Sequence, residues 1–75
     1  MIQDLRDTIE HNLKKANLIV KRLYEDLLVY DNDTYICAIY FYKSKLLITP
    51  YHIYIDYSDL DIDSIIKKIK NFMYK

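Results

Sequence analysis

The sequence predicts an α+β domain with a long N-terminal helix, a small antiparallel sheet of two or three strands and an amphipathic C-terminal helix. Apolar residues recur every three or four positions toward both ends of the chain, as they do on one face of a helix. The middle of the chain is dense in tyrosine and β-branched residues, which favour strands. With 75 residues, of which 52% are hydrophobic, the chain can form one core and is expected to be a single domain over 1–75. The expected order is αβββα or αββα.

The first element is predicted to be one helix over about 4–29. No proline interrupts this segment, Asp4 is a suitable N-cap, and Glu10 and Lys14 form a favourable pair one turn apart. The apolar positions of the segment keep helical spacing: they are Leu5, Ile9, Leu13, Ala16, Val20, Leu23 and Leu27.

A helix of this length is too long for its own domain. About 26 residues at 1.5 Å per residue would extend roughly 39 Å, whereas a compact chain of this size has a diameter of roughly 30 Å. Either the helix bends near 14–17, or its end projects and packs against another surface. Because Leu18, Ile19 and Val20 point in three successive directions, we expect a homodimer formed through this helix. The residues expected at that contact are Ala16, Ile19, Val20, Leu23 and Leu27.

The sheet is predicted to follow a helix end at Asp31–Asp33, where Asn32 takes a left-handed conformation because the chain has no glycine. The first strand, over about 34–42, is apolar on both faces, which indicates that both faces are covered. A turn at Lys43–Lys45 leads to a second apolar run over about 46–49.

Pro50 decides the number of strands. As the second residue of a turn over 49–52 it would separate strands over about 46–49 and 51–57. On an edge strand it could instead lie within one long arm of a two-stranded hairpin. We favour three strands, because an arm over 45–57 would extend well past the first strand.

The C-terminal segment over about 59–74 is predicted to be an amphipathic helix. Ser58 to Asp61 resembles a capping box that starts the helix, with aspartate in place of the usual glutamate. The apolar positions are Ile62, Ile65, Ile66, Ile69, Phe72 and Met73.

Composition excludes several classes of function. Lys plus Arg and Asp plus Glu number 11 each, so no overall charge draws the chain to nucleic acid or to an anionic membrane. The absence of glycine argues against phosphate-binding loops. The single cysteine, Cys37, forms no internal disulfide, and no signal peptide or membrane-spanning run is recognisable. We expect a soluble, cytoplasmic protein without a membrane partner.

Asp59, Asp61 and Asp63 resemble the start of a calcium-binding loop, but the pattern requires a glycine and a glutamate where this chain has Ser64 and Lys70. One cysteine and two distant histidines are too few for zinc. We therefore expect no metal site and no cofactor.

No catalytic machinery is recognisable, and we expect no enzymatic activity. His52, Tyr54 and Asp56 alternate along one strand face, about 7 Å apart, which is too far for direct hydrogen bonds. Cys37 has no charged neighbour in sequence that would activate it.

Tyrosines and acids are the candidate partner-binding groups. Tyr40, Tyr42 and Tyr54 are expected to share one face of the sheet with His52 nearby, and tyrosine is enriched at protein interfaces. The alternatives are that the helices cover this face or that it stacks nucleic-acid bases. The acidic candidates, which could imitate nucleic acid if they also met Asp31 and Asp33, are Asp56, Asp59, Asp61 and Asp63.

These observations favour a non-enzymatic protein-binding inhibitor. The excess of isoleucine, lysine, tyrosine and asparagine indicates AT-rich coding DNA, as in phages and mobile elements of low-GC bacteria. We expect it to occlude the surface of a host protein in the host cytoplasm, as an anti-CRISPR or other anti-defence protein does. The alternatives are a nucleic-acid-binding regulator that uses Lys67, Lys68, Lys70 and Lys75, and an obligate subunit or immunity-type partner.

Overall fold

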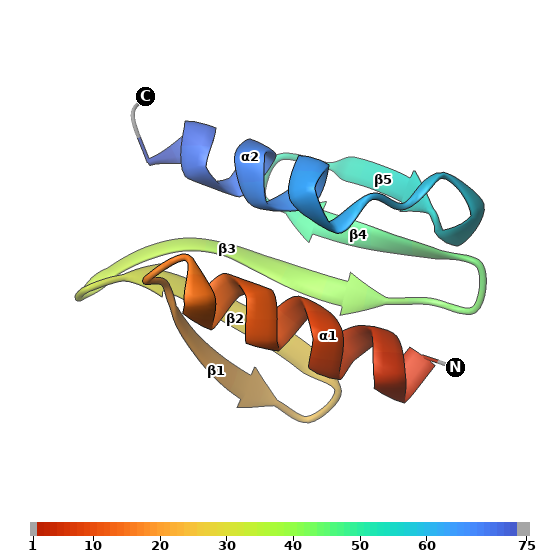
Figure 1. The fold of residues 1–75 in the computed structure, drawn as a ribbon, viewed down its shortest axis with the longest axis horizontal. Helices are drawn as coiled ribbons and strands as arrows, with labels where there is room; N and C mark the ends of the chain where they lie inside the picture. The colour runs from red at the N-terminus through yellow and green to blue at the C-terminus, as the bar shows by residue number, and fades with distance from the viewer. Residues whose placement is uncertain (1, 74–75) are drawn as a thin grey trace.

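The computed structural model describes residues 2–73, which form two helices and five strands (Figure 1). Tyr74 and Lys75, which we placed at the end of the second helix and in its basic surface, lie outside the described residues. The elements are α1 (Ile2–Lys15), β1 (Ile19–Leu23), β2 (Asp26–Asp31), β3 (Thr34–Phe41), β4 (Lys45–Thr49), β5 (Ile53–Asp56), the 3-10 turn η1 (Tyr57–Asp59) and α2 (Ile62–Phe72).

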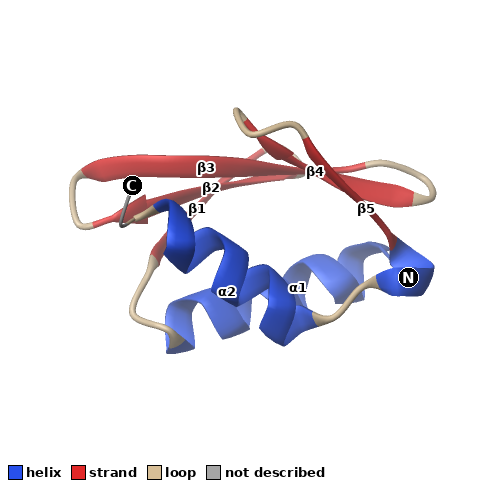
Figure 2. Ribbon diagram, turned by 90° about the horizontal axis from the view of Figure 1, so that it is seen from above, coloured by secondary structure: helices blue, strands red, loops and turns tan. Residues whose placement is uncertain are grey.

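The strands form one antiparallel sheet in the order β1-β2-β3-β4-β5. Each strand pairs with the next along the chain, and both helices lie on the same side of the sheet (Figure 2). The α+β class is confirmed. The expected count of two or three strands is wrong, because residues expected in the first helix form an additional hairpin, β1–β2.

The first helix ends at Lys15 rather than near residue 29. Asn17 has a φ of 69°, and the backbone N–H of Leu18 donates to the carbonyl of Leu13 at 3.1 Å. The N–H of Asn17 donates to the carbonyl of Lys14 at 3.0 Å. These two bonds define a Schellman motif, in which a left-handed residue turns the chain so that N–H groups just past the helix donate to its last carbonyls. Leu13 and Leu18 are both buried in the core, so packing fixes the end of the helix at the segment where the length argument placed a bend.

Left-handed residues also make the turns of the first two hairpins. Tyr24, in the two-residue turn between β1 and β2, has a φ of 58°. Asn32 has a φ of 54° in the turn between β2 and β3. The left-handed conformation expected at Asn32 is confirmed, but it belongs to a hairpin and not to a helix end.

We expect Tyr24→Gly to raise the free energy of unfolding by about 0.5–1 kcal/mol. A left-handed conformation costs a residue with a Cβ about 1–2 kcal/mol, and glycine avoids that cost. Part of this gain in stability is lost, because glycine increases the conformational entropy of the unfolded chain. In a continuous helix the same change would lower stability by about 1 kcal/mol. Urea unfolding measures the sign, and Glu25→Gly, at a neighbouring position without positive φ, is the matched control that should destabilise the protein.

The core lies between the helices and the inner face of the sheet. The fully buried residues are Ile9 and Leu13 from α1, Ile65 and Ile69 from α2, and Leu27, Val29, Cys37, Ile39, Leu46 and Ile48 from the sheet.

β3 is the central strand, and its residues 36–39 are all buried. We expected both faces of this strand to be covered, but the helices cover only one of them. On the other side, neighbouring side chains of the sheet itself bury Ala38, as described below.

Residues 50–52 form a turn that separates β4 from β5, so the favoured interpretation, in which Pro50 lies in a turn between two strands, is confirmed. The start of α2 differs from the prediction. Its N-cap is Asp61, whose carboxylate accepts from the backbone N–H of Asp63 at 3.2 Å and from Oγ of Ser64 at 2.9 Å. Ser58, the expected cap, lies in η1.

Candidate functional site on the uncovered sheet face

Neither of the two helices in residues 2–73 lies over the second face of the sheet (Figure 2). Residues paired across antiparallel strands share a face, and alternate residues along a strand point to opposite faces. The core residues Leu27, Ile39 and Ile48 form one cross-strand row, so the neighbouring rows belong to the opposite, outer face. The outer face consists of Ile19, Lys21 and Leu23 of β1, Asp26, Leu28 and Tyr30 of β2, Tyr35, Ala38 and Tyr40 of β3, Lys45, Leu47 and Thr49 of β4, and Tyr54 and Asp56 of β5.

Aromatic and aliphatic side chains dominate the outer face. Tyr54 is 57% exposed and Tyr35 is 47% exposed, and Ile19 and Leu23 are exposed on the edge strand. The ring of Tyr35 packs edge-on against that of Tyr30, with centroids 5.7 Å apart and an interplanar angle of 73°. Large exposed apolar surface of this kind marks interaction sites on soluble proteins.

The centre of the outer face is buried although no helix covers it. Ala38 is 1% exposed and Leu47 is 8% exposed. Leu47 lies between Tyr40 and Tyr54 in one cross-strand row. We attribute the burial to the larger side chains beside these residues, so the tyrosines form a continuous surface over small and aliphatic residues.

Charges on the outer face are balanced. Lys21 Nζ lies 5.0 Å from the ring centroid of Tyr30, and Lys45 Nζ lies 5.1 Å from that of Tyr54. Lys45 is paired across the strands with Asp56, and burial raises the pKa of the fourth charged residue, Asp26. Two lysines and two aspartates therefore leave no net charge on this face.

Of the expected tyrosine group, the structure brings Tyr40 and Tyr54 onto the same face. Tyr42 follows β3 in the turn to β4, where its carbonyl accepts a hydrogen bond from the hydroxyl of Tyr57. His52 lies in the turn between β4 and β5, with a φ of 57°. Because these two turns are at opposite ends of β4, Tyr42 and His52 do not lie together.

The acidic candidates are divided. Asp56 belongs to the outer face, whereas Asp59 lies in η1 and Asp61 and Asp63 start α2. Asp31 lies with Phe72 and Met73 at the opposite end of that helix, about 16 Å away for 11 residues. The six carboxylates therefore do not form one patch.

The residues expected at a homodimer contact do not share a helix. Ala16 follows α1, Leu27 is fully buried in the core, and Val20 is on the inner face of β1. Ile19 and Leu23 are exposed on the outer face. The helix on which that contact depended is absent from this segment, and homodimerisation stays a prediction.

Sequence reasoning missed the contribution of the first hairpin. Ile19, Leu23, Leu28, Tyr30 and Tyr35 belong to the outer face but were not assigned to it. Residues 18–22 and 27–31 do not alternate between apolar and polar side chains, so the sequence has no clear strand signal there, and their apolar residues partly match a helical period of three to four.

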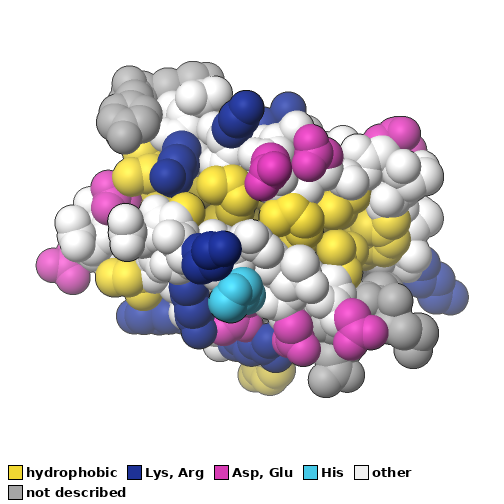
Figure 3. All heavy atoms as spheres, viewed as in Figure 1, with side chains coloured by type: hydrophobic (Ala, Val, Ile, Leu, Met, Phe, Trp, Pro, Cys, Tyr) yellow, Lys and Arg dark blue, Asp and Glu magenta, His cyan; other side chains and the backbone are white. Residues whose placement is uncertain are grey.

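The helix side of the molecule is different in character. Figure 3 shows charged side chains on both helices and an apolar band between them. Arg22 extends from β1 to α1, where its Nε donates to Glu10 Oε1 at 2.6 Å and its guanidinium also pairs with Asp7. Hydrogen bonds from Lys14 and from Arg22 lower the pKa of Glu10. The cluster includes the expected Glu10–Lys14 ion pair, at 2.8 Å. We interpret the cluster as the contact that holds α1 against the edge strand β1.

Within the described part of the chain, no three His, Cys, Asp or Glu side chains gather closely enough to hold a metal ion. Neither helix in residues 2–73 has the length and apolar character that a membrane span requires. Comparison with protein-family models, curated proteins and solved structures finds no match to this chain. Its function therefore has to be argued from its own geometry.

Proposed function

We propose that this chain is a non-enzymatic protein-binding inhibitor, encoded by a phage or mobile element of a low-GC bacterium, that occludes a surface of a host protein. A defence protein is the proposed target, as for an anti-CRISPR inhibitor. The outer face of the sheet is the proposed binding surface.

The single observation that carries the proposal is the uncovered, tyrosine-rich outer face. A sheet with helices on one side normally presents polar residues on the other side. Here the outer face instead contains Tyr30, Tyr35, Tyr40 and Tyr54 around aliphatic residues. Tyrosine contributes large contact area at low cost in side-chain entropy, and it is enriched among the residues that dominate binding energy.

The charge balance of the same face favours a protein partner over nucleic acid. Nucleic-acid binding draws its affinity from lysine and arginine contacts to phosphate. The two lysines of the outer face lie close to aromatic rings, and Lys45 has an aspartate opposite it. Such a surface has no excess of positive charge for a polyanion.

One observation supports the alternative of a nucleic-acid-binding regulator. Aromatic residues on an open sheet can stack bases, and α2 carries exposed lysines at positions 67, 68 and 70. Those lysines belong to the helix layer, on the opposite side of the sheet from the tyrosines (Figure 2). The two features therefore do not form one binding surface.

The proposal predicts that a host protein is captured through Tyr40 and Tyr54. A tagged form of the chain is used for affinity purification from host lysate, and captured proteins are identified by mass spectrometry. The double variant Tyr40→Ala, Tyr54→Ala is expected to weaken binding of the captured protein about 10- to 100-fold. Affinity is measured with the purified partner by calorimetry.

Tyr24→Ala is the matched control, because Tyr24 is 94% exposed in a turn and is not part of the outer face. It should bind as the parent does, and circular dichroism should show that all variants are folded. Retention of full affinity by the double variant would reject the outer face as the binding surface. Capture that disappears after nuclease treatment, with strongly salt-dependent binding to random DNA or RNA, would favour the regulator.

A further inference from the structure

The pairing of the strands leaves part of the central strand without a neighbour on one side. β4 pairs with β3 only over residues 38–41, whereas β3 begins at Thr34. Residues 34, 35 and 37 pair with β2 on one side, and no strand of residues 2–73 pairs with 34–37 on the other. Within the described residues, no backbone hydrogen bond joins them to the turn over 50–52. The backbone N–H and C=O groups of this segment that point away from β2 thus have no partner strand, and Thr34 and Tyr35 are exposed there.

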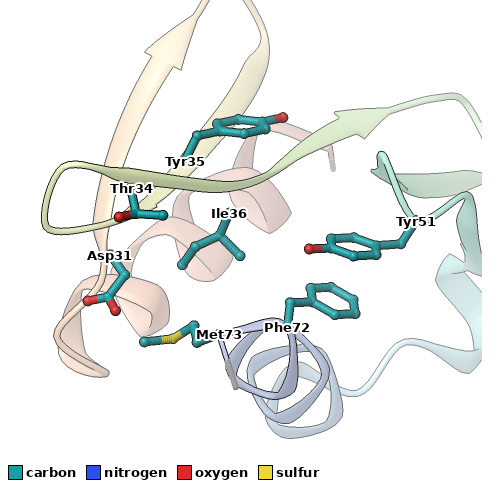
Figure 4. Close-up of a pocket in the computed structure, with 7 residues that line it drawn as sticks. All are labelled: Asp31, Thr34, Tyr35, Ile36, Tyr51, Phe72 and Met73. Carbon is teal, nitrogen blue, oxygen red and sulfur yellow. The ribbon is translucent and has the colours of Figure 1, made fainter. Parts of the chain in front are cut away.

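A pocket of about 290 Å³ lies against this bare edge (Figure 4). Thr34, Tyr35 and Ile36 of β3 line one side of it. Tyr51, from the turn after β4, and Phe72 lie across from Ile36, whereas the ring of Tyr35 points to the other side of β3. The rings of Tyr51 and Phe72 are stacked, with centroids 3.7 Å apart and an interplanar angle of 15°. The aromatic pair makes a preformed wall that faces the edge of β3.

The bare edge also contains an irregularity of the sheet. The register between β2 and β3 shifts by one residue at Val29/Tyr30, so that Ile36 is the additional residue of β3. Bulges of this kind redirect side chains and occur frequently beside functional sites. Ile36 is buried and lines the pocket.

The charged residue that lines the pocket is acidic. Asp31 lines the pocket and makes no ion pair with another described residue. The C-terminal end of α2, at Phe72 and Met73, presents the negative end of a helix dipole there. A cationic side chain next to the pocket would be favoured over an acidic one.

We propose that the bare edge of β3 and its pocket bind an extended segment of a partner protein as an additional strand. The segment would pair antiparallel to β3, in line with β4, place an apolar side chain between Ile36 and Phe72, and place a lysine or arginine two residues later beside Asp31. In this mode backbone hydrogen bonds give affinity and the side-chain pocket gives specificity. The pocket is at the lower limit of the volumes found for small-molecule sites, which suits a single side chain.

This inference goes beyond the proposed function, because it concerns a neighbouring surface with its own ligand, which shares only Tyr35 with the outer face. The outer face can fail as a binding surface while the strand site binds peptide, and the converse also holds. The two results are separable, since Tyr40 and Tyr54 do not line the pocket.

The probe is an acetylated and amidated peptide, Thr-Val-Phe-Thr-Lys-Val-Thr, titrated to about 2 mM into isotopically labelled full-length protein. We expect NMR shift changes at the amides of 34–37, Tyr51 and Phe72, and slower amide exchange in 34–37. A peptide with glutamate in place of lysine should bind about three- to tenfold more weakly. A peptide methylated on its three central backbone nitrogens should not bind.

Asp31→Lys should reverse the preference between the lysine and glutamate peptides. Asp33→Lys is the matched control, because it makes the same charge change in the adjacent turn without lining the pocket, and it should keep the preference. Absence of shifts at 34–37 with the lysine peptide would overturn the proposal, as would shifts confined to the outer face. Shifts at 34–37 that appear with rising protein concentration alone would identify a second copy as the occupant and would also overturn it.

Discussion

Replacing Ile39 by alanine is expected to lower the free energy of unfolding by about 4 kcal/mol, within the range of about 2–5 kcal/mol found for large-to-small changes in cores. Ile39 is fully buried at the centre of β3, where it pairs with Leu27 on one side and with Ile48 on the other. Helices cover this face of the sheet (Figure 2). Partners on three sides restrict how far the site can collapse into the space left by the truncation.

That loss is large for a domain of this size. At roughly 0.05–0.15 kcal/mol per residue, 75 residues give a stability of about 4–11 kcal/mol. We therefore expect Ile39→Ala to be partly or largely unfolded at 37 °C, as measured by urea and thermal unfolding followed by circular dichroism. Ile39→Val, which removes one methyl group, should cost only about 1 kcal/mol.

Leu28→Ala is the control from the outer face. Leu28 neighbours Leu27 in β2 but points away from the helices and is only half-buried, so its truncation should cost about 1 kcal/mol. Equal losses for Leu28→Ala and Ile39→Ala would contradict the assignment of the two faces. They would imply that the outer face is also covered, for example by a second copy.

The second half of the sequence could be interpreted correctly because its signals agree with one another. Pro50 marks a turn, Tyr54 and Asp56 alternate with isoleucines, and Ile65 and Ile69 follow helical spacing. Local propensity, periodicity and turn residues all indicate the same elements there. The observed β4, β5 and α2 lie within a few residues of the predicted bounds.

The first hairpin could not be recognised, because its turn lacks a turn signal. Tyr24 and Glu25 are not residues that normally favour a two-residue hairpin turn. β1 is an edge strand with exposed Lys21 and Arg22, so its polarity resembles that of the exposed side of a helix. Only the conflict between helix length and domain size indicated a break, and it located the break close to Asn17.

The candidate site was predictable in part for the same reason. Tyr40 and Tyr54 lie in correctly predicted strands, so their shared face could be inferred from alternation alone. Tyr30 and Tyr35 lie on either side of the turn between β2 and β3. Residues 26–29 of β2 were assigned to the first helix, so this hairpin was not predicted. The face of the sheet that the helices cover depends on tertiary packing, and it cannot be inferred from the periodicity of a single sequence.

The stability of the fold is expected to fall steeply between pH 9 and pH 12, and much of this loss should come from Cys37. This thiol is fully buried in the core, and burial raises the pKa of Cys37 to about 12 from its ordinary value of 9.0. The folded state therefore keeps the thiol protonated in a range where the unfolded chain ionises. Stability from this group is intact below pH 9 and is lost as the pH rises toward 12.

The difference of about 3 pKa units corresponds to roughly 4 kcal/mol at pH 12. Cys37→Ala removes the ionisable group and should be about 1 kcal/mol less stable than the parent at pH 7, because it leaves a small cavity. Above pH 9 its stability should decline less steeply, so that the order of stability reverses before pH 12. Urea unfolding of both proteins at pH 7, 9, 10 and 11 measures this reversal.

Burial also raises the pKa of Tyr35 and of Tyr57, and both tyrosines ionise in the parent and in the variant. The charge of the ionised Cys37 also raises the pKa of Tyr35, so the difference between the two stability curves reports the thiol together with its coupling to Tyr35, and their common slope reports the remaining groups. Parallel curves from pH 9 to pH 11 would contradict a buried, protonated Cys37. Reaction of the parent with a thiol reagent at pH 8 provides an independent measurement. Because the Cys37 side chain is enclosed in the core, the reaction rate should follow the population of the unfolded state and rise with urea. An exposed thiol would instead react rapidly in the folded protein.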